Sequence, residues 1–150
     1  MTETTHVSRN EGLAFEDGAD RGRILVSGAQ THGVYSLMAW TVAPSTDHNA
    51  FGAHRHNKIE ETFLIQSGQL EFLLGDQVTD MGPGDFVRVP TGVRHGYANR
   101  SGRPVEMLVS FHPGGFEQLF VKYRTDAAAP LEGSGFIFDA TADFASEFEP

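Results

Sequence analysis

Three histidines and one glutamate in the middle of the chain could together hold a metal ion. One residue, Arg55, separates His54 from His56. On a strand, such residues point to the same face with Cα atoms roughly 6.5–7 Å apart, so their imidazoles can converge. Glu61 follows a segment short enough for a chain reversal, and His95 comes from a later hairpin. Imidazole nitrogens with a carboxylate suit a divalent transition metal. Each residue alone is more often an ordinary strand or loop residue, so the prediction depends on all four occurring together.

The composition excludes several other kinds of chemistry and partner. The chain has no cysteine, which excludes disulfides and thiolate metal sites. Its net charge of -9 repels nucleic-acid phosphates and anionic lipid head groups. It has no apolar run long enough to span a bilayer, and its N-terminus lacks the features of a secretion signal. We therefore expect a cytoplasmic protein that binds a small molecule, with no nucleic-acid or membrane partner.

Short strands separated by turns should position the four residues. The 17 glycines and 7 prolines favour an all-β chain with many turns over long helices. Regular short strands with turn residues between them predict an antiparallel sandwich or barrel. The expected strands cover residues 24–27, 33–43, 51–56, 61–66, 69–74, 85–89, 96–99 and 105–112.

The two ends of the chain differ from this central pattern. Residues 1–22 are polar and charged, and we interpret them as an N-terminal arm or edge segment. Residues 126–150 form an acidic tail that also contains phenylalanines. Between them, residues 23–125 form one domain of a barrel and a short helix. The helix is indicated by apolar residues at i, i+3, i+4 and i+7, which are Phe116, Leu119, Phe120 and Tyr123.

The two histidine-containing segments resemble the two motifs of the cupin family. Residues 54–68 read H-x-H, four residues, E, six residues, G, as in the first motif. Residues 84–99 read G, five residues, P-x-G, two residues, H, three residues, N, which matches the second motif at every position. His48 stands where the first motif usually opens with a turn glycine. The resemblance runs from about residue 33 to 112, and residues 111–117 resemble the end of bacterial single-domain cupins described as quercetinase-like.

The resemblance implies a fold, a ligand set and a cofactor. The fold would be an antiparallel double-stranded β-helix, the cupin or jelly-roll barrel, with a short C-terminal helix, and the protein would be a homodimer. The cofactor would be one divalent transition metal per chain, either Fe, Mn, Ni, Co or Zn. The implied metal ligands are His54, His56, Glu61 and His95. The implied turn residues are Gly68, Gly84, Pro90 and Gly92, with Asn99 pinning the second hairpin.

Strand alternation indicates which side chains could line a pocket beside the metal. Apolar walls with a few polar groups suit a flat or greasy small molecule. Each of these residues could instead simply fill the barrel. The candidates are Phe51, Phe63, Ile65, Phe86, Tyr97, Met107 and Phe111, with Trp40 and Phe72 as further wall residues.

Three functions remain open from the sequence. The leading hypothesis is a metal-dependent dioxygenase acting on an enolic or aromatic, flavonol-like molecule, with Glu61 as catalytic general base. The second is a redox-neutral metalloenzyme, such as an isomerase or polyketide cyclase. The third is a non-catalytic cupin that binds a small molecule.

Overall fold

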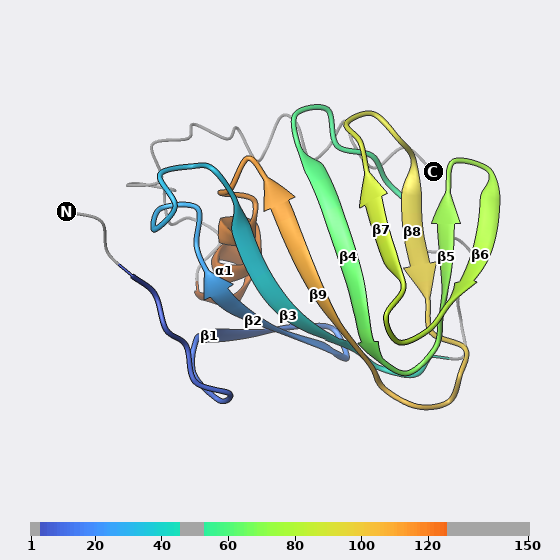
Figure 1. Cartoon of the computed structure of the whole chain (residues 1–150). Helices are drawn as coiled ribbons and strands as arrows, with labels where there is room; N and C mark the ends of the chain where they lie inside the picture. Colours follow the sequence, from blue (N-terminus) through green and yellow to red (C-terminus); the bar gives the residue numbers. More distant parts are fainter. Residues whose placement is uncertain (1–3, 46–52, 126–150) are drawn as a thin grey trace.

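Two antiparallel sheets curve around a shared interior in the computed structural model, which describes residues 4–45 and 53–125 (Figure 1). One sheet has six strands in the order β1-β2-β3-β9-β4-β7, and the other has three in the order β6-β5-β8. This is the predicted double-stranded β-helix with a short C-terminal helix. The elements are β1 (Leu13–Asp17), β2 (Asp20–Val26), β3 (Ser36–Val42), β4 (Glu60–Ser67), β5 (Leu70–Leu74), β6 (Gln77–Met81), β7 (Phe86–Val89), β8 (His95–Ala98), β9 (Val105–His112) and α1 (Glu117–Thr125).

Two of the strands were not expected from the sequence. β1 lies within the range interpreted as an arm or edge segment, and it pairs with β2 along its whole length at the edge of the larger sheet. β6 pairs with β5 at the edge of the smaller sheet. Each has a single buried residue, Phe15 in β1 and Met81 in β6, so neither sequence carries the alternation of a half-buried strand.

The strand expected over residues 51–56 is wrong for the part that the structure describes. In residues 53–56, only His54 forms a bridge, and that bridge is isolated and joins His95. Residues 51 and 52 lie outside the described residues. The imidazoles of this segment are therefore placed without a continuous strand ladder.

The core lies between the two sheets and follows from strict alternation along the long strands. β3 and β9 each bury every second residue, and β4 does so through Glu61, Phe63 and Ile65. From the smaller sheet, Phe72 is fully buried and packs edge-on against Phe63, with ring centroids 4.8 Å apart. Burying each such side chain is worth about 1.5–3 kcal/mol, so these contacts hold the sheets together.

The helix α1 packs against the β1 end of the larger sheet, as Figure 1 shows. The predicted apolar stripe accounts for this, because Phe116 and Leu119 are buried. Phe120 stacks on Phe15 with centroids 5.0 Å apart and meets the edge of Trp40 at 5.2 Å. The backbone of Tyr123 is helical, and its side chain lies outside the described part of the structure.

The turns that the sequence singled out fix the hairpins around the interior. Gly68 and Gly92 have φ of +85° and +82°, the left-handed conformation that favours glycine. A Cβ at Gly68 would also lie 2.9 Å from the carbonyl oxygen of Pro104. Gly84 lies in the turn before β7, and Pro90 lies between β7 and the Gly92 turn.

Asn99 ties the end of β8 to two other parts of the chain. The side chain is fully buried, and its amide donates to the carbonyl oxygens of Val42 at 3.1 Å and Arg103 at 2.7 Å. Its oxygen accepts from the backbone N–H of Ser101 at 3.1 Å and from the Ser101 hydroxyl at 2.7 Å. These bonds hold the turn after β8 against the larger sheet.

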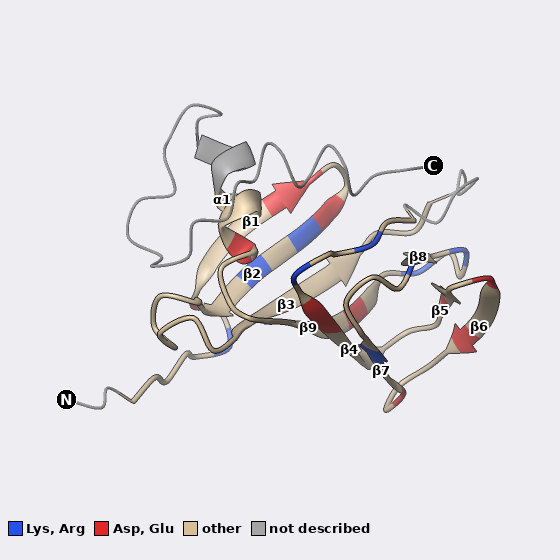
Figure 2. Cartoon of the chain, turned by 90° about the horizontal axis from the view of Figure 1, so that it is seen from above, with Lys and Arg blue, Asp and Glu red and all other residues tan. Residues whose placement is uncertain are grey.

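The charged residues of β1 are acidic, and β2 carries Asp20 followed by the basic Arg21 and Arg23 (Figure 2). The interior is apolar apart from a small group of polar side chains. Among the described residues, no helix is long and apolar enough to cross a membrane.

Candidate metal centre

The structure brings the four predicted ligands together. The ligand atoms of His54, His56, Glu61 and His95 all lie within 4.8 Å of one another. His56, Glu61 and His95 are buried, with 3%, 6% and 1% of their surface exposed, and His54 is half-buried. A buried group of three imidazoles and one carboxylate is a cluster that could hold a metal ion.

Three parts of the chain position these side chains. The backbones of His54 and His95 exchange two hydrogen bonds, of 2.9 and 2.8 Å, and this bridge brings their rings to a centroid distance of 4.4 Å. The N–H of Gly92 donates to the carbonyl of His56 at 2.7 Å, which ties the turn before β8 to this segment. Glu61 is the second residue of β4 and points inward by strand alternation.

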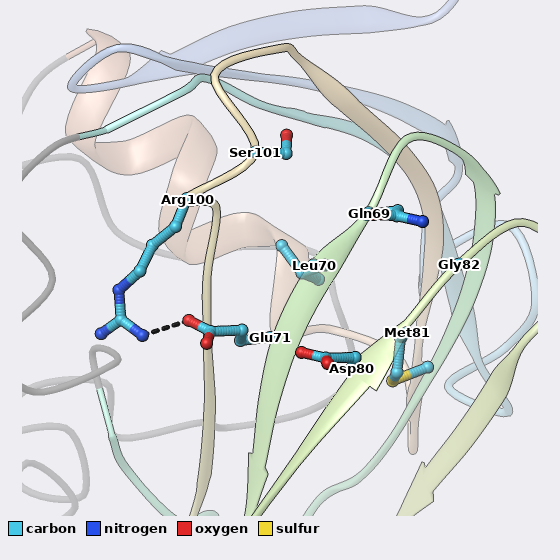
Figure 3. A pocket seen from close by; sticks show the side chains of 8 residues that line it. All are labelled: Gln69, Leu70, Glu71, Asp80, Met81, Gly82, Arg100 and Ser101. Carbon is cyan, nitrogen blue, oxygen red and sulfur yellow. Dashed lines mark hydrogen bonds and ion pairs between the residues drawn. The ribbon is translucent and has the colours of Figure 1, made fainter.

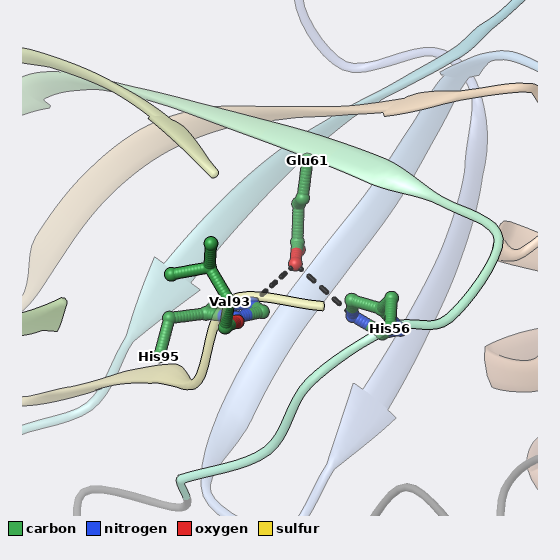
Figure 4. A network of polar contacts seen from close by, with 4 residues as sticks. All are labelled: His56, Glu61, Val93 and His95. Atoms are coloured by element: carbon green, nitrogen blue, oxygen red, sulfur yellow. Dashed lines mark hydrogen bonds and ion pairs between the residues drawn. The ribbon is translucent and has the colours of Figure 1, made fainter. Parts of the chain in front are cut away.

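The Glu61 carboxylate lies between two imidazoles. Figure 4 shows its Oε2 facing both rings, 2.9 Å from His95 Nε2 and 3.2 Å from His56 Nε2. Burial raises the pKa of Glu61, but the interactions with the adjacent His56 and His95 imidazoles outweigh burial and lower the pKa from 4.5 to about 2. Glu61 is therefore a carboxylate at neutral pH.

A backbone carbonyl determines which ring nitrogen of His95 faces the cluster. Nδ1 of His95 lies 2.9 Å from the carbonyl oxygen of Val93, and a carbonyl can only accept, so Nδ1 carries the hydrogen (Figure 4). In the neutral ring, Nε2 then holds a lone pair, which faces the Glu61 oxygen at 2.9 Å. Two lone pairs at that distance need a cation or an added proton between them.

The donor set therefore fits a divalent metal ion. Histidines that bind metals commonly donate their other ring N–H to a backbone carbonyl, which is the arrangement of His95 and Val93. The carboxylate supplies negative charge, and burial excludes competing water. The residues that would hold the ion are His54, His56, Glu61 and His95.

Most of the predicted pocket residues fill the core. Phe63, Ile65, Met107 and Phe111 are no more than 2% exposed. Their side chains lie between the sheets and form the apolar wall of the interior, and the ring centroid of Phe63 is 6.2 Å from that of His95. Phe51 lies outside the described residues.

Tyr97 is the predicted pocket residue that adds a polar group to this wall. It lies two residues after His95 on β8, and its ring is 6.2 Å from both Phe63 and Phe72. Burial, followed by the nearby carboxylates of Asp20 and Glu61, raises the pKa of its phenol well above 10. The phenol therefore stays protonated and can donate a hydrogen bond.

The assignment of Phe86 to the pocket is wrong. Its side chain is 60% exposed and lies on the outer face of the larger sheet, opposite Leu64. Because alternate residues of a strand face opposite sides, the inward positions of β7 are Val87 and Val89. No feature of the sequence indicates which of the two alternating sets of β7 residues faces inward.

Two residues beside the cluster were missed by the sequence analysis. The carbonyl of Val93 orients His95. The one sequence feature that could have indicated this role is the place of Val93 two residues before His95. The ring of Phe116 packs edge-on against His56, with centroids 4.8 Å apart. Phe116 was noticed only as the first residue of an apolar helix stripe.

A separate cavity of about 350 Å³ lies where β5 and β6 meet the turn after β8 (Figure 3). None of the four cluster residues lines it. Arg100 forms an ion pair with Glu71 at its rim, and both side chains are partly exposed. The lining residues are Gln69, Leu70, Glu71, Asp80, Met81, Gly82, Arg100 and Ser101.

Comparison with protein families agrees with this architecture. Residues 39–111 match the family model Cupin_2, described as a cupin domain. With the double-stranded β-helix described above, this match makes the chain a small cupin-domain protein. No curated protein matches the chain at a significant level.

Several solved structures share the fold at low sequence identity. KdgF from Halomonas sp. has a TM-score of 0.63 at 13% identity, with 75% of this chain and 97% of that chain covered. A predicted oxalate decarboxylase from Thermotoga maritima has a TM-score of 0.62 at 16% identity, with 74% and 99% covered. Pac13, a nucleoside dehydratase from Streptomyces, has a TM-score of 0.60 at 19% identity, with 77% and 88% covered. At these identities the likeness concerns the fold alone.

Proposed function

We propose that this cupin is a metal-dependent dioxygenase that acts on a small enolic or aromatic molecule. The observation that carries the proposal is the buried cluster of His54, His56, Glu61 and His95, with ligand atoms within 4.8 Å of one another. A divalent ion bound by these four donors would have positions left for oxygen ligands and a charge that favours the enolate form of a substrate.

The chain's own residues would bind the substrate and move its proton. Glu61 is ionised at neutral pH, and it is the group of the cluster that would accept a proton from an enol or phenol whose acidity a bound cation would increase. His95 is held in one tautomer by Val93, so its Nε2 stays directed into the cluster. The protonated Tyr97 can donate a hydrogen bond to a substrate oxygen.

The aromatic rings beside the cluster are the reason for proposing a flat substrate. Phe63, Phe72 and Tyr97 form a group of rings beside His95, with centroids 4.8 to 6.2 Å apart. In a dioxygenation, both atoms of O₂ end in the products and the substrate supplies the electrons, so no separate reductant is required.

The test is oxygen uptake with enolic aromatic substrates such as flavonols. The protein is loaded in turn with Fe(II), Mn(II), Co(II) or Ni(II), and His54→Ala serves as the control that weakens the cluster. Uptake by the loaded wild type that is lost in His54→Ala supports the proposal. An absence of uptake with every metal and every enolic aromatic substrate contradicts it.

A second candidate is a redox-neutral reaction, such as isomerisation or polyketide cyclisation. Glu61 offers a proton acceptor and Tyr97 a hydrogen-bond donor near the same cluster, and neither role requires an oxidant. Structures with this fold include the nucleoside dehydratase Pac13 and a sugar phosphate isomerase from Silicibacter pomeroyi. Turnover without oxygen by the Zn(II)-loaded protein would favour this candidate. Ligand binding that survives metal removal would instead favour a non-catalytic binding protein.

We also propose that the protein is a cytoplasmic homodimer. The strands β1, β7, β6 and β8 form the edges of the two sheets, and exposed edges favour pairing with another chain. Light scattering coupled to size-exclusion chromatography tests this. A mass near the 16.4 kDa of one chain would contradict the dimer.

A further inference from the structure

We infer that Phe116 is a positioning residue for the metal centre, and that the buried Glu117 beside it fixes Phe116 in place. The inference rests on the proposed metal site. It extends that site to the start of α1, which supplies none of the four donors.

Phe116 contacts His56 directly, and it also contacts Phe111, which is the strand neighbour of Glu61. Its ring is 6% exposed and meets the His56 ring at 77°, with centroids 4.8 Å apart. The same ring packs on Phe111 at 4.9 Å, and Phe111 stands opposite Glu61 in the pairing of β9 with β4. Phe116 therefore contacts the His56 imidazole directly, and through Phe111 it supports the position of Glu61 on β4.

His56 needs such support because it does not lie in a strand. In the described segment 53–56, the only bridge is at His54. The bond from Gly92 to the His56 carbonyl holds the backbone, but it does not set the rotation of the ring. Ring orientation depends on the side-chain contacts of His56, and these include the Phe116 ring and the Glu61 carboxylate.

Glu117, the residue that follows Phe116, fixes the start of α1. Its side chain is fully buried, and its two carboxylate oxygens accept from the N–H of Gly28 at 2.6 Å and of Gly115 at 2.7 Å. A buried carboxylate is stable only with such partners, and its place in the first turn of α1 also suits the helix dipole. These bonds connect the helix start to the loop between β2 and β3.

The backbone on both sides of this connection is too close for side chains. A Cβ added to Gly28 would lie 2.5 Å from the nitrogen of Gly115, and one added to Gly114 would lie 2.5 Å from the carbonyl carbon of Tyr35. The N–H of Gly114 also donates to the carbonyl of Gly33 at 3.0 Å. The start of α1 therefore sits on the β2–β3 loop, and the place of Phe116 is set from outside the metal cluster.

The test compares Phe116→Leu with Phe120→Leu in the full chain. Phe120 belongs to the same aromatic group and meets the edge of Phe116 at 5.8 Å, but its nearer ring contacts are Phe15 at 5.0 Å and Trp40 at 5.2 Å. It is therefore a matched control for loss of a ring from this region. The readouts are the Co(II) dissociation constant from competition with a chromophoric chelator, the visible absorption spectrum of bound Co(II), and the unfolding temperature of the metal-free protein.

We expect both variants to lower the unfolding temperature, and only Phe116→Leu to change metal binding. Its Co(II) affinity should fall about tenfold, as for residues that orient a ligand, and its Co(II) spectrum should shift. Glu117→Gln keeps the size of the side chain but removes the negative charge that accepts from the N–H groups of Gly28 and Gly115. It should change the Co(II) spectrum in the same direction as Phe116→Leu. It also serves as the test if Phe116→Leu does not fold.

The outcomes separate this inference from the proposed function. If wild type, Phe116→Leu and Glu117→Gln bind Co(II) with equal affinity and identical spectra, Phe116 is an ordinary core residue and the inference is wrong, while the metal centre stands. Equal losses in Phe116→Leu and Phe120→Leu would also overturn it. If wild type binds no Co(II), the metal centre fails first and the inference fails with it.

Discussion

Two carboxylates of this small barrel, Glu61 and Glu71, each face a basic side chain in very different surroundings. Glu61 is 6% exposed and lies between His56 and His95, whereas Glu71 pairs with Arg100 at the rim of the surface cavity. The side chains of Glu71 and Arg100 are 31% and 47% exposed. Water screens the exposed pair, but the buried carboxylate depends on the groups around it.

The backbones that carry these groups also differ. Glu71 comes from the middle strand of the smaller sheet, with regular pairing on both sides. Two of the donors beside Glu61 come from a segment outside any strand, which has one isolated bridge at His54 and a hydrogen bond from Gly92 to His56, and their rings pack against each other. The comparison shows that the side chains able to do chemistry here are buried, converge on one point and are positioned by other side chains. At the cavity rim, Glu71 and Arg100 instead neutralise each other.

The largest expected effect is that of removing a buried donor. His95→Ala deletes an imidazole that is 1% exposed and lies 2.9 Å from Glu61, so metal affinity should fall by more than the roughly 100-fold upper range of orienting residues. Competition with a chromophoric chelator measures this. His112→Ala, at an exposed position on β9, is the control and should bind metal as wild type does. Equal affinity in all three proteins would mean that the buried cluster does not bind the ion.

A large but more selective effect is expected at Glu61. Glu61→Gln keeps the side-chain size and removes the proton acceptor, so turnover should fall about 10²–10⁴-fold, the range for a general base. Metal affinity should fall less, because the three imidazoles remain. Steady-state oxygen uptake and metal titration of the same samples compare the two losses. A fully active Glu61→Gln would show that Glu61 has no catalytic role.

A smaller effect is expected from Tyr97 at high pH. Because burial and nearby carboxylates raise its pKa well above 10 in the folded protein, the unfolded phenol ionises first as pH rises. The free energy of unfolding should therefore decline above pH 10, and less steeply in Tyr97→Phe. Ultraviolet titration of the three tyrosines in the wild type and of the remaining two in Tyr97→Phe identifies the late one. If Tyr97→Phe removes a tyrosine that titrates near pH 10, the phenol is not shielded as described.

The smallest effect is expected at the surface cavity. Arg100→Ala breaks an exposed ion pair, and such pairs contribute about 0–1 kcal/mol. The free energy of unfolding should change by about 0.5 kcal/mol or less, and metal affinity should not change. Urea denaturation and metal titration provide the two values. A loss of metal affinity in Arg100→Ala would show that the surface cavity and the buried cluster are coupled, which would contradict the comparison.

The sequence predicted the parts of the molecule that depend on local pattern. The spacing of the two histidine segments indicated all four members of the cluster, and alternation along β3, β4 and β9 indicated the inner wall. Gly68 and Gly92 adopt the positive φ expected of them. Each of these features follows from the spacing of residues that are close in the sequence, so a single sequence is enough to predict it.

Features set by tertiary contacts were less accessible. β1 and β6 bury one residue each, and Phe86 could not be assigned to a face without knowing the phase of its short strand. The contact between Phe116 and His56 joins the helix start to a loop far earlier in the chain. The apolar stripe of the helix predicted that Phe116 would be buried, but it contained nothing about the group against which the ring would pack.

The most direct test of the central claim is elemental analysis of protein purified without an affinity tag or chelator, beside His54→Ala. The account predicts about one divalent transition metal ion per chain in the wild type and a clear loss in the variant. Failure of the folded wild type to retain any of Fe, Mn, Co, Ni or Zn, even after reconstitution, would contradict it.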